Sequence, residues 1–176
     1  MIKKLKIKSL GTYFFISLFI SGIYVSKDYG ISWDESHHRD SGQRVLVYLV
    51  KFFGLGWVKP IPEGLENFNY LEKMYGPIFD TISAIIEESF QLNDFRHIYT
   101  MRHGLNFIFY FAGYLSYFFF IKLVFPKNKY AILLSFFYLF HPRLLGQGFF
   151  NPKDSILQSY ITISMIPIIK SFMHFK

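Results

Sequence analysis

The chain has 176 residues, of which 52% are hydrophobic and 22% aromatic, and this composition excludes an ordinary soluble domain. Its formal net charge of +7 would suit a nucleic-acid partner, but the charges are segregated along the chain. All acidic residues except Asp154 lie between Lys27 and Arg102, while the basic residues gather in the N-terminal tail and around the later apolar runs. This segregation is typical of membrane topology, so we expect no nucleic-acid partner. The absence of cysteine excludes disulfides and thiolate metal sites.

Four apolar runs are expected to cross the membrane and to make the chain a single all-α integral membrane domain. They cover residues 9–26, 104–125, 130–145 and 155–172. At about 1.5 Å per residue, the second run reaches across a hydrocarbon core of about 30 Å, whereas the third and fourth are shorter. Lysines before the first run hold the N-terminus in the cytoplasm, which places residues 27–103 outside and both termini inside. In a bacterium this would be the inner membrane.

The first run could instead be a cleaved signal peptide, because its basic tail and apolar length are compatible with one. No clear small-residue cleavage site follows it, since the chain leaves the run as Tyr24-Val25-Ser26-Lys27. An uncleaved anchor is therefore the favoured interpretation.

The outer loop 27–103 is expected to contain two helices that lie at the membrane interface. Residues 34–53 repeat apolar side chains at three- and four-residue steps, and their polar residues dominate the front half. A glycine pair and the loop 60–64 end this helix. A second helix is expected over residues 69–90, with a kink or break at Gly76-Pro77.

The second interfacial helix separates apolar from acidic side chains. Its isoleucines at 78, 82, 85 and 86 lie on one side, and Asp80, Glu87 and Glu88 lie largely elsewhere. From Asp94 the chain is expected to continue directly into the second span.

Asp34 and Glu35 are adjacent carboxylates that emerge from the first span on the outer face. Two ionisable carboxylates near a bilayer surface suit a base that acts on a membrane-bound substrate, so both are candidate catalytic residues. A structural interpretation also fits, because Ser32 could cap a helix and Glu35 could reach back to the Ser32 amide. The two interpretations are compatible if Glu35 caps the helix while Asp34 faces the substrate.

Asp154 is the only acidic residue after position 94, and it lies in the turn Asn151–Asp154 between the third and fourth spans. Asn151 at an N-cap and Pro152 at the first helical position predict a helix start there. A carboxylate near a membrane usually also has a partner or a function. Four-span topology returns this turn to the outer face, where Asp154 and Asp34 would share one aqueous pocket for acid–base or metal chemistry. The sequence requires no cofactor, but a divalent metal could bind between these two carboxylates.

Four cationic side chains near the span ends could bind a phosphate group of a substrate. They are Arg102, His103, Arg143 and Lys153. Ordinary snorkelling of the side chain to the interface is the alternative for Arg143 and Lys153. His37 and His38 suggest a metal, but adjacent residues on a helix point in different directions, so both are expected to be exposed.

The order of these parts resembles the N-terminal part of the polytopic C-type glycosyltransferases, the superfamily of protein O-mannosyltransferases and lipid A aminoarabinose transferase. The resemblance covers nearly the whole chain and is carried by three motifs. They are Trp33-Asp34-Glu35 after the first span, Arg102-His103-Gly104-Leu105-Asn106 at the second, and the stretch from His141 to Asp154 with its Phe-Asn-Pro-Lys-Asp ending.

The resemblance implies an inverting transfer of a sugar from a polyprenyl-phosphate carrier to an acceptor at the outer membrane face. Asp34 corresponds to the acidic residue of the first loop, which acts as the base or orients the acceptor. Arg143 or Lys153 would stabilise the departing phosphate, and Asp154 corresponds to a second acidic position with a role in metal or substrate binding.

Members of this superfamily usually carry many further spans. We therefore expect the chain to be the front part of a larger transferase fold, with a second polypeptide as one way to complete it, and to be inactive alone if that part is missing. The alternative is a non-catalytic membrane protein that binds partners through its aromatic spans.

Overall fold

The computed structural model describes residues 2–54, 76–125 and 128–174, and all regular structure within them is helical. The helices are α1 (Ile2–Val25), the 3-10 turn η1 (Ser26–Asp28), α2 (Glu35–Phe53), α3 (Ile78–Ser89), α4 (Phe95–Val124), α5 (Asn128–Leu139), α6 (Pro142–Phe150) and α7 (Asp154–His174). The all-α fold class is therefore confirmed. The predicted loop 60–64 and the first part of the predicted helix 69–90 lie outside the described residues.

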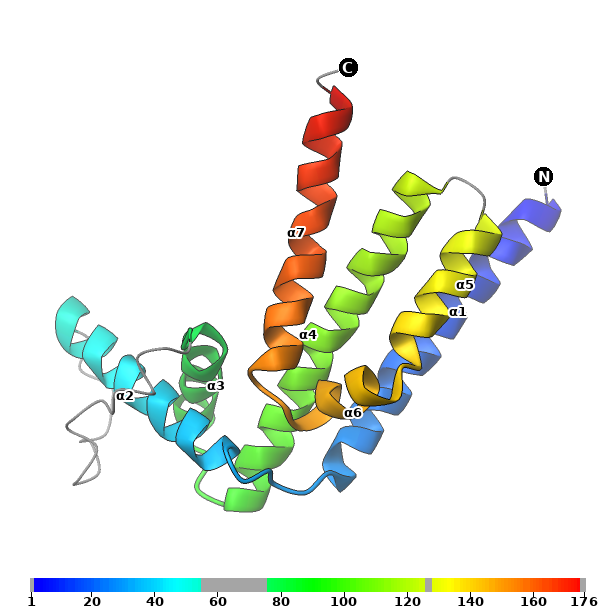
Figure 1. Cartoon of the computed structure of the whole chain (residues 1–176). Helices are drawn as coiled ribbons and strands as arrows, with labels where there is room; N and C mark the ends of the chain where they lie inside the picture. The colour runs from blue at the N-terminus through cyan, green and yellow to red at the C-terminus, as the bar shows by residue number, and fades with distance from the viewer. Residues whose placement is uncertain (1, 55–75, 126–127, 175–176) are drawn as a thin grey trace.

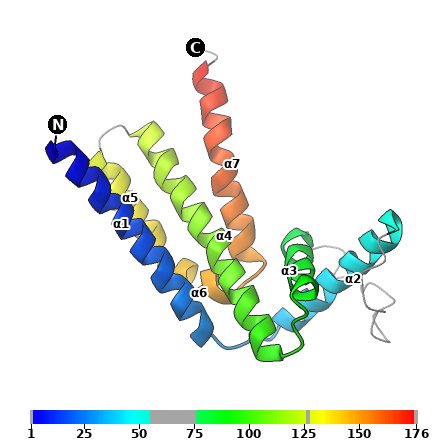
Figure 2. The same ribbon diagram turned by 180° about the vertical axis from the view of Figure 1, so that it is seen from behind.

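Helix α4 is the central element of the fold. It contacts α1, α3, α5, α6 and α7, and its 30 residues extend over about 45 Å. Figures 1 and 2 show α1, α4, α5 and α7 side by side, with both chain termini at one end of the bundle. At the other end, α2 and α3 extend sideways from the base of α4. Helices α2 and α3 thus form a helical arm at one end of the bundle.

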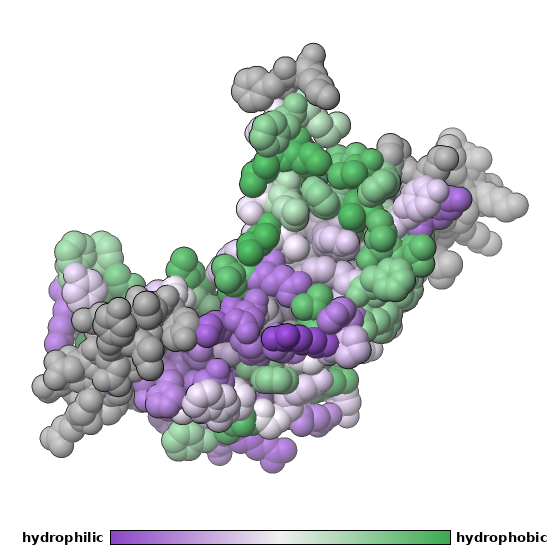
Figure 3. Space-filling model, in the orientation of Figure 1, coloured by the Kyte–Doolittle hydropathy of each residue, from purple (hydrophilic) through white to green (hydrophobic). Residues whose placement is uncertain are grey.

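Two helices of the described chain are long and apolar enough to cross a membrane: α4, and α7 over Asp154–Met173. A shorter apolar helix covers Lys129–Leu139. Figure 3 shows hydrophobic residues gathered over the end of the bundle that carries the C-terminus, and hydrophilic residues gathered towards the base of the arm. These features suggest membrane association.

The predicted third span, 130–145, is wrong in its extent. Helix α5 ends at Leu139, and α6 begins as a separate helix at Pro142. A residue before proline is driven away from the helical region, and His141 is accordingly extended (φ −65°, ψ 116°). Pro142 then occupies the start of α6, where its missing N–H leaves no helical hydrogen bond unmade.

Aromatic side chains form the core between α4, α5 and α6. The buried cluster consists of Phe107, Tyr110, Phe111, Tyr114, Tyr138, Leu139 and Phe149. The rings of Phe107 and Phe149 stack at 5.0 Å, and the Tyr110 hydroxyl donates to the Leu139 carbonyl at 3.0 Å. Tyr29, in the segment after η1, stacks on the same Phe149 ring at 4.5 Å. The core thus connects the segment after η1 to α6.

Helices α2 and α3 pack closely because Gly42 lies against the α3 backbone. A Cβ atom on Gly42 would collide with the Asp80 carbonyl oxygen. Helix α2 ends at Gly54, whose left-handed conformation (φ 67°) is typical of a glycine cap.

The orientation of α3 gives its polar residues an unexpected place. Asp80, Ser83 and Glu87 are buried, whereas Ile78 is 62% exposed and Ile85 is 38% exposed. The predicted separation of apolar and acidic faces is present, but the acidic face packs inward. Residues 76–77 are not helical and α3 begins after Pro77, while the part of the predicted helix before Gly76 lies outside the described residues.

Candidate functional site

The turn that carries Asp34 is closed by the side chain of Glu35. The Glu35 Oε2 atom accepts a hydrogen bond from the Ser32 backbone N–H at 2.8 Å, as the capping-box interpretation predicted. The Ser32 hydroxyl, however, donates to Asp34 Oδ1 at 2.8 Å, and Asp34 rather than Ser32 is the N-cap residue of α2. Asp34 remains partly exposed.

Glu35 and His103 form a buried pair between α2 and α4. Each residue is 2% exposed, and Glu35 Oε1 lies 2.9 Å from His103 Nε2. Because an ionised carboxylate can only accept hydrogen bonds, it requires a proton on Nε2 of the imidazole. The structure therefore brings together one predicted catalytic residue and one predicted phosphate-binding residue.

Asp80 joins three helices through a second buried group. Its Oδ1 atom accepts from Arg102 Nη2 at 2.6 Å, and its Oδ2 atom lies 3.0 Å from His38 Nδ1. Arg102 is 2% exposed, and its other terminal nitrogen, Nη1, has no acceptor among the described residues. The guanidinium that was predicted to bind a phosphate is thus already paired with a carboxylate.

Arg39 and Glu87 form the third charged contact, between α2 and α3. Arg39 Nε lies 3.0 Å from one Glu87 oxygen and 3.1 Å from the other, and Gln43 donates to Glu87 at 2.9 Å. Hydrogen bonding to Glu87 raises the pKa of the Arg39 guanidinium further above its ordinary value. Bidentate contacts of this kind fix orientation as well as supplying energy.

The three contacts Glu35–His103, Asp80 with Arg102 and His38, and Arg39–Glu87 are together called the charged layer. The sequence did not predict which residues pair within it. The prediction that His38 is exposed is wrong, since it is 9% exposed and contacts Asp80, whereas His37 is exposed. The available signal was the spacing of Asp80, Ser83 and Glu87, which places three polar side chains along one stripe of α3. A polar stripe on an interfacial helix can face either water or a polar partner, and only the fold reveals which.

The turn Asn151–Asp154 has the capping geometry predicted for it. Asn151 Oδ1 accepts from the backbone N–H groups of Lys153 (3.0 Å) and Asp154 (2.9 Å), and Asn151 Nδ2 lies 3.3 Å from Asp154 Oδ2. Helix α7 begins at Asp154, two residues later than predicted. Lys153 and Asp154 are both exposed.

One turn of α4 contacts both the Asp34 turn and the helices on either side of the Asp154 turn. Asn106 lies three residues after His103, and its amide donates to the Gln147 carbonyl of α6 at 3.1 Å. The Ser155 hydroxyl of α7 donates to Asn106 Oδ1 at 3.2 Å. His103 anchors the Asp34 turn, and Asn106 anchors the helices on either side of the Asp154 turn.

Asp34 and Asp154 are nevertheless not in contact. Within the described parts of the chain, no hydrogen bond joins them, and no group of three or more His, Asp or Glu residues is placed to hold a metal ion. A divalent metal at these carboxylates stays a prediction.

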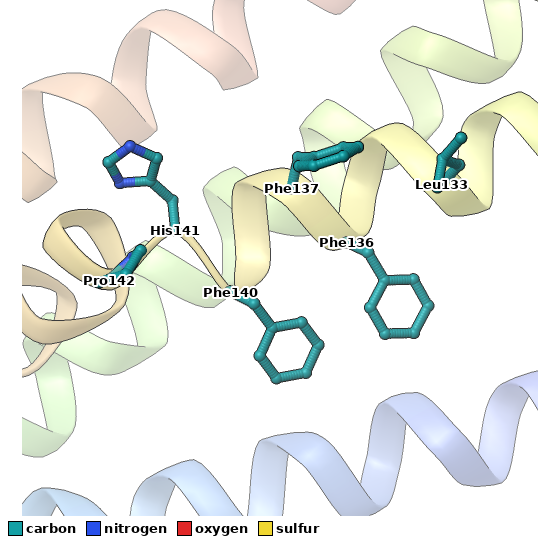
Figure 4. A pocket seen from close by; sticks show the side chains of 6 residues that line it. All are labelled: Leu133, Phe136, Phe137, Phe140, His141 and Pro142. Atoms are coloured by element: carbon teal, nitrogen blue, oxygen red, sulfur yellow. The ribbon is translucent and has the colours of Figure 1, made fainter.

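Arg143 is exposed in the first turn of α6 and follows Pro142, which lines an apolar cavity of about 420 Å³. The cavity is lined by Leu133, Phe136, Phe137, Phe140, His141 and Pro142. Figure 4 shows the Phe136 and Phe140 rings on the side of α5 that faces α1, with His141 on the other side. An apolar surface therefore ends at a histidine and a cation.

No family model, curated protein or solved structure matches this chain. The function must therefore be argued from the chemistry and placement of its residues.

Proposed function

We propose that the chain is a membrane glycosyltransferase module that transfers a sugar from a polyprenyl-phosphate carrier to an acceptor at the outer membrane face. The observation that carries the proposal is the shared anchoring of two acidic turns by one turn of α4. His103 binds the residue next to Asp34, and Asn106 binds Gln147 and Ser155 around the Asp154 turn.

In this mechanism Asp34 is the general base. It removes the proton from the acceptor hydroxyl as that oxygen attacks the anomeric carbon of the sugar. The bond between the anomeric carbon and the phosphate oxygen breaks, and the lipid phosphate leaves with the electron pair. Asp34 suits this role because it is partly exposed and keeps one carboxylate oxygen outside its contact with Ser32.

The carrier lipid would bind along α5 and α6. The apolar cavity lined by Phe136 and Phe140 suits a hydrocarbon chain, and Arg143, which follows the lining residue Pro142, would bind the phosphate. Lys153 would add a second positive charge from the next turn. Arg102 and His103 are buried at 2% exposure, so the phosphate role falls to the exposed Arg143 and Lys153.

The proposed topology has α1, α4, α5 and α7 as the spans, both termini in the cytoplasm, and α2 and α3 at the outer interface. It is supported by the position of both termini at one end of the bundle (Figures 1 and 2). Exposed aromatic side chains on the arm suit an interfacial position, because aromatic rings are enriched where hydrocarbon meets water. They are Tyr48, Phe52 and Phe53 on α2, with Trp33 just before α2 and Phe90 just after α3.

The test is Asp34→Asn, assayed in membranes with radiolabelled mannosyl and glucosyl undecaprenyl phosphate as donors. Transfer of label should fall by about 10²–10⁴-fold, the usual contribution of a general base. Asp28→Asn is the matched control, because Asp28 is an exposed carboxylate in the same segment and should leave transfer unchanged. Unchanged transfer in Asp34→Asn at equal membrane levels would exclude Asp34 as the base, and transfer no greater than in membranes without the chain would favour a non-catalytic, partner-binding protein.

A further inference from the structure

The two adjacent carboxylates of the candidate site have opposite environments. Asp34 is partly exposed, whereas Glu35 is 2% exposed and both of its carboxylate oxygens are engaged. A buried carboxylate with both oxygens occupied has no free approach to a substrate hydroxyl. Glu35 therefore needs a role other than that of a second base.

We propose that Glu35 and His103 are positioning residues that fix Asp34 for the transfer reaction, a role that rests on the proposed function. Three hydrogen bonds run in series from α4 to Asp34. His103 Nε2 contacts Glu35 Oε1 at 2.9 Å, Glu35 Oε2 accepts from the Ser32 amide at 2.8 Å, and the Ser32 hydroxyl donates to Asp34 Oδ1 at 2.8 Å. This series of hydrogen bonds ends on Asp34 Oδ1, and the other carboxylate oxygen, Oδ2, would take the proton.

The origin of this hydrogen-bond chain explains why a positioning pair would matter. His103 is three residues before Asn106, which holds α6 and α7 and thereby the turn with Lys153 and Asp154. The pair thus fixes Asp34 relative to the groups that would bind the phosphate. A displacement of about 1 Å at a reacting group can lower a rate by about 10²-fold.

Burial keeps the pair closed. Separating Glu35 from His103 would leave a buried polar group without its hydrogen-bond partner, so the closed arrangement is preferred to the open one. Arg102, the neighbour of His103, holds Asp80 in the same layer, so the α4 side of the pair is itself fixed.

The first experiment measures the position of residue 34 without needing a substrate. Because the chain has no cysteine, Asp34→Cys introduces a single thiol that can be alkylated in membranes. Adding Glu35→Ala or His103→Ala should change its alkylation rate, and Glu35→Ala should change it at least as much, because it removes the Ser32 contact as well as the His103 contact. Ala84→Cys is the control, since Ala84 is 1% exposed between α2 and α3 and its thiol should stay protected in both backgrounds.

The second experiment separates positioning from catalysis by Glu35. Glu35→Gln keeps both hydrogen bonds, because its amide oxygen accepts from Ser32 and its amide nitrogen donates to the other tautomer of His103. Glu35→Gln should therefore retain most of the transfer activity and the alkylation rate at position 34. Glu35→Ala and His103→Ala should lower kcat by about 10²-fold with little change in KM, measured with the same mannosyl and glucosyl donors.

The outcomes are distinct. The positioning role is overturned if Asp34→Cys reacts equally fast with and without the pair, or if Glu35→Gln is as inactive as Asp34→Asn. Full transfer by Asp34→Asn would instead overturn the proposed function, and the positioning role would fall with it. Loss in Asp34→Asn and Glu35→Ala, together with retention in Glu35→Gln, supports both.

Discussion

Removal of the Asp80 carboxylate should detach the helical arm from α4. Asp80 is 4% exposed and is the shared partner of His38 on α2 and Arg102 on α4. In Asp80→Ala the Arg102 guanidinium stays buried but loses its 2.6 Å contact with a carboxylate. No water-exposed position is available to that guanidinium without movement of α3 or α4, since its side chain is only 2% exposed.

The expected cost is large for a single substitution. Breaking one partner of a buried ion pair typically costs about 3–5 kcal/mol, because an uncompensated charge remains in a low-dielectric site. At about 2–4 °C per kcal/mol for a chain of this length, the melting temperature should fall by about 6–20 °C. The double variant Asp80→Leu/Arg102→Leu removes both charges and should recover most of the loss, because paired apolar residues often match a buried ion pair in stability.

The assay is thermal unfolding in detergent, followed by circular dichroism at the helical band, together with alkylation of Ala84→Cys at the α2–α3 contact. Asp28→Ala is the matched control, because it removes an exposed carboxylate. A shift below about 1 kcal/mol in Asp80→Ala, or a double variant less stable than either single one, would refute the assignment of Asp80 as the buried partner of Arg102.

Two further predictions concern helix contact and topology. Gly42→Ala should cost about 1–3 kcal/mol, since its Cβ would collide with the Asp80 carbonyl oxygen and force α2 away from α3. Gly30→Ala, where an added Cβ meets nothing within 4 Å, should be neutral in the same melting assay. Lys153→Cys should react with a membrane-impermeant maleimide from outside intact cells if α5 and α7 are both spans; its protection there, with labelling only after permeabilisation, would indicate a hairpin that enters from the cytoplasm.

Hydrophobic periodicity and helix-end residues predicted most of the helices. The apolar spacing of residues 34–53 matches α2. Helix α4 starts directly after Asp94 as expected, and the Asp94 carboxylate caps it by accepting from the Arg96 amide at 2.6 Å. The extent of the third span was overestimated because apolar content continues across His141-Pro142 while the backbone cannot stay helical there. The apolar composition does not reveal this break in the helix, whereas Pro142 in the sequence does, because the residue before a proline is disfavoured in the helical conformation.

The candidate site was only partly predictable, and the reason is physical. The carboxylate pair at 34–35 and the Arg102-His103 pair are visible as unusual charges beside apolar runs. Their mutual contacts depend on how α2 and α3 fold back onto α4, over sequence separations of 68 residues for Glu35–His103 and 22 for Asp80–Arg102. No local pattern encodes which cation pairs with which carboxylate. A cation that could bind a substrate phosphate and a cation that pairs with a carboxylate of the fold therefore look the same in the sequence.

The inward-facing acidic stripe of α3 agrees with the proposed position of the arm at the membrane interface. If its isoleucines contact hydrocarbon, they gain little by packing on α2, because lipid is as apolar as another side chain. Helices in such surroundings are held by close backbone approach and by polar contacts, and the arm has both: Gly42 against Asp80, and Arg39 and His38 against Glu87 and Asp80. The charged layer is therefore what gives the arm a defined position on α4. The position of the Asp34 carboxylate, and so the geometry of any reaction there, would depend on that layer rather than on the aromatic core.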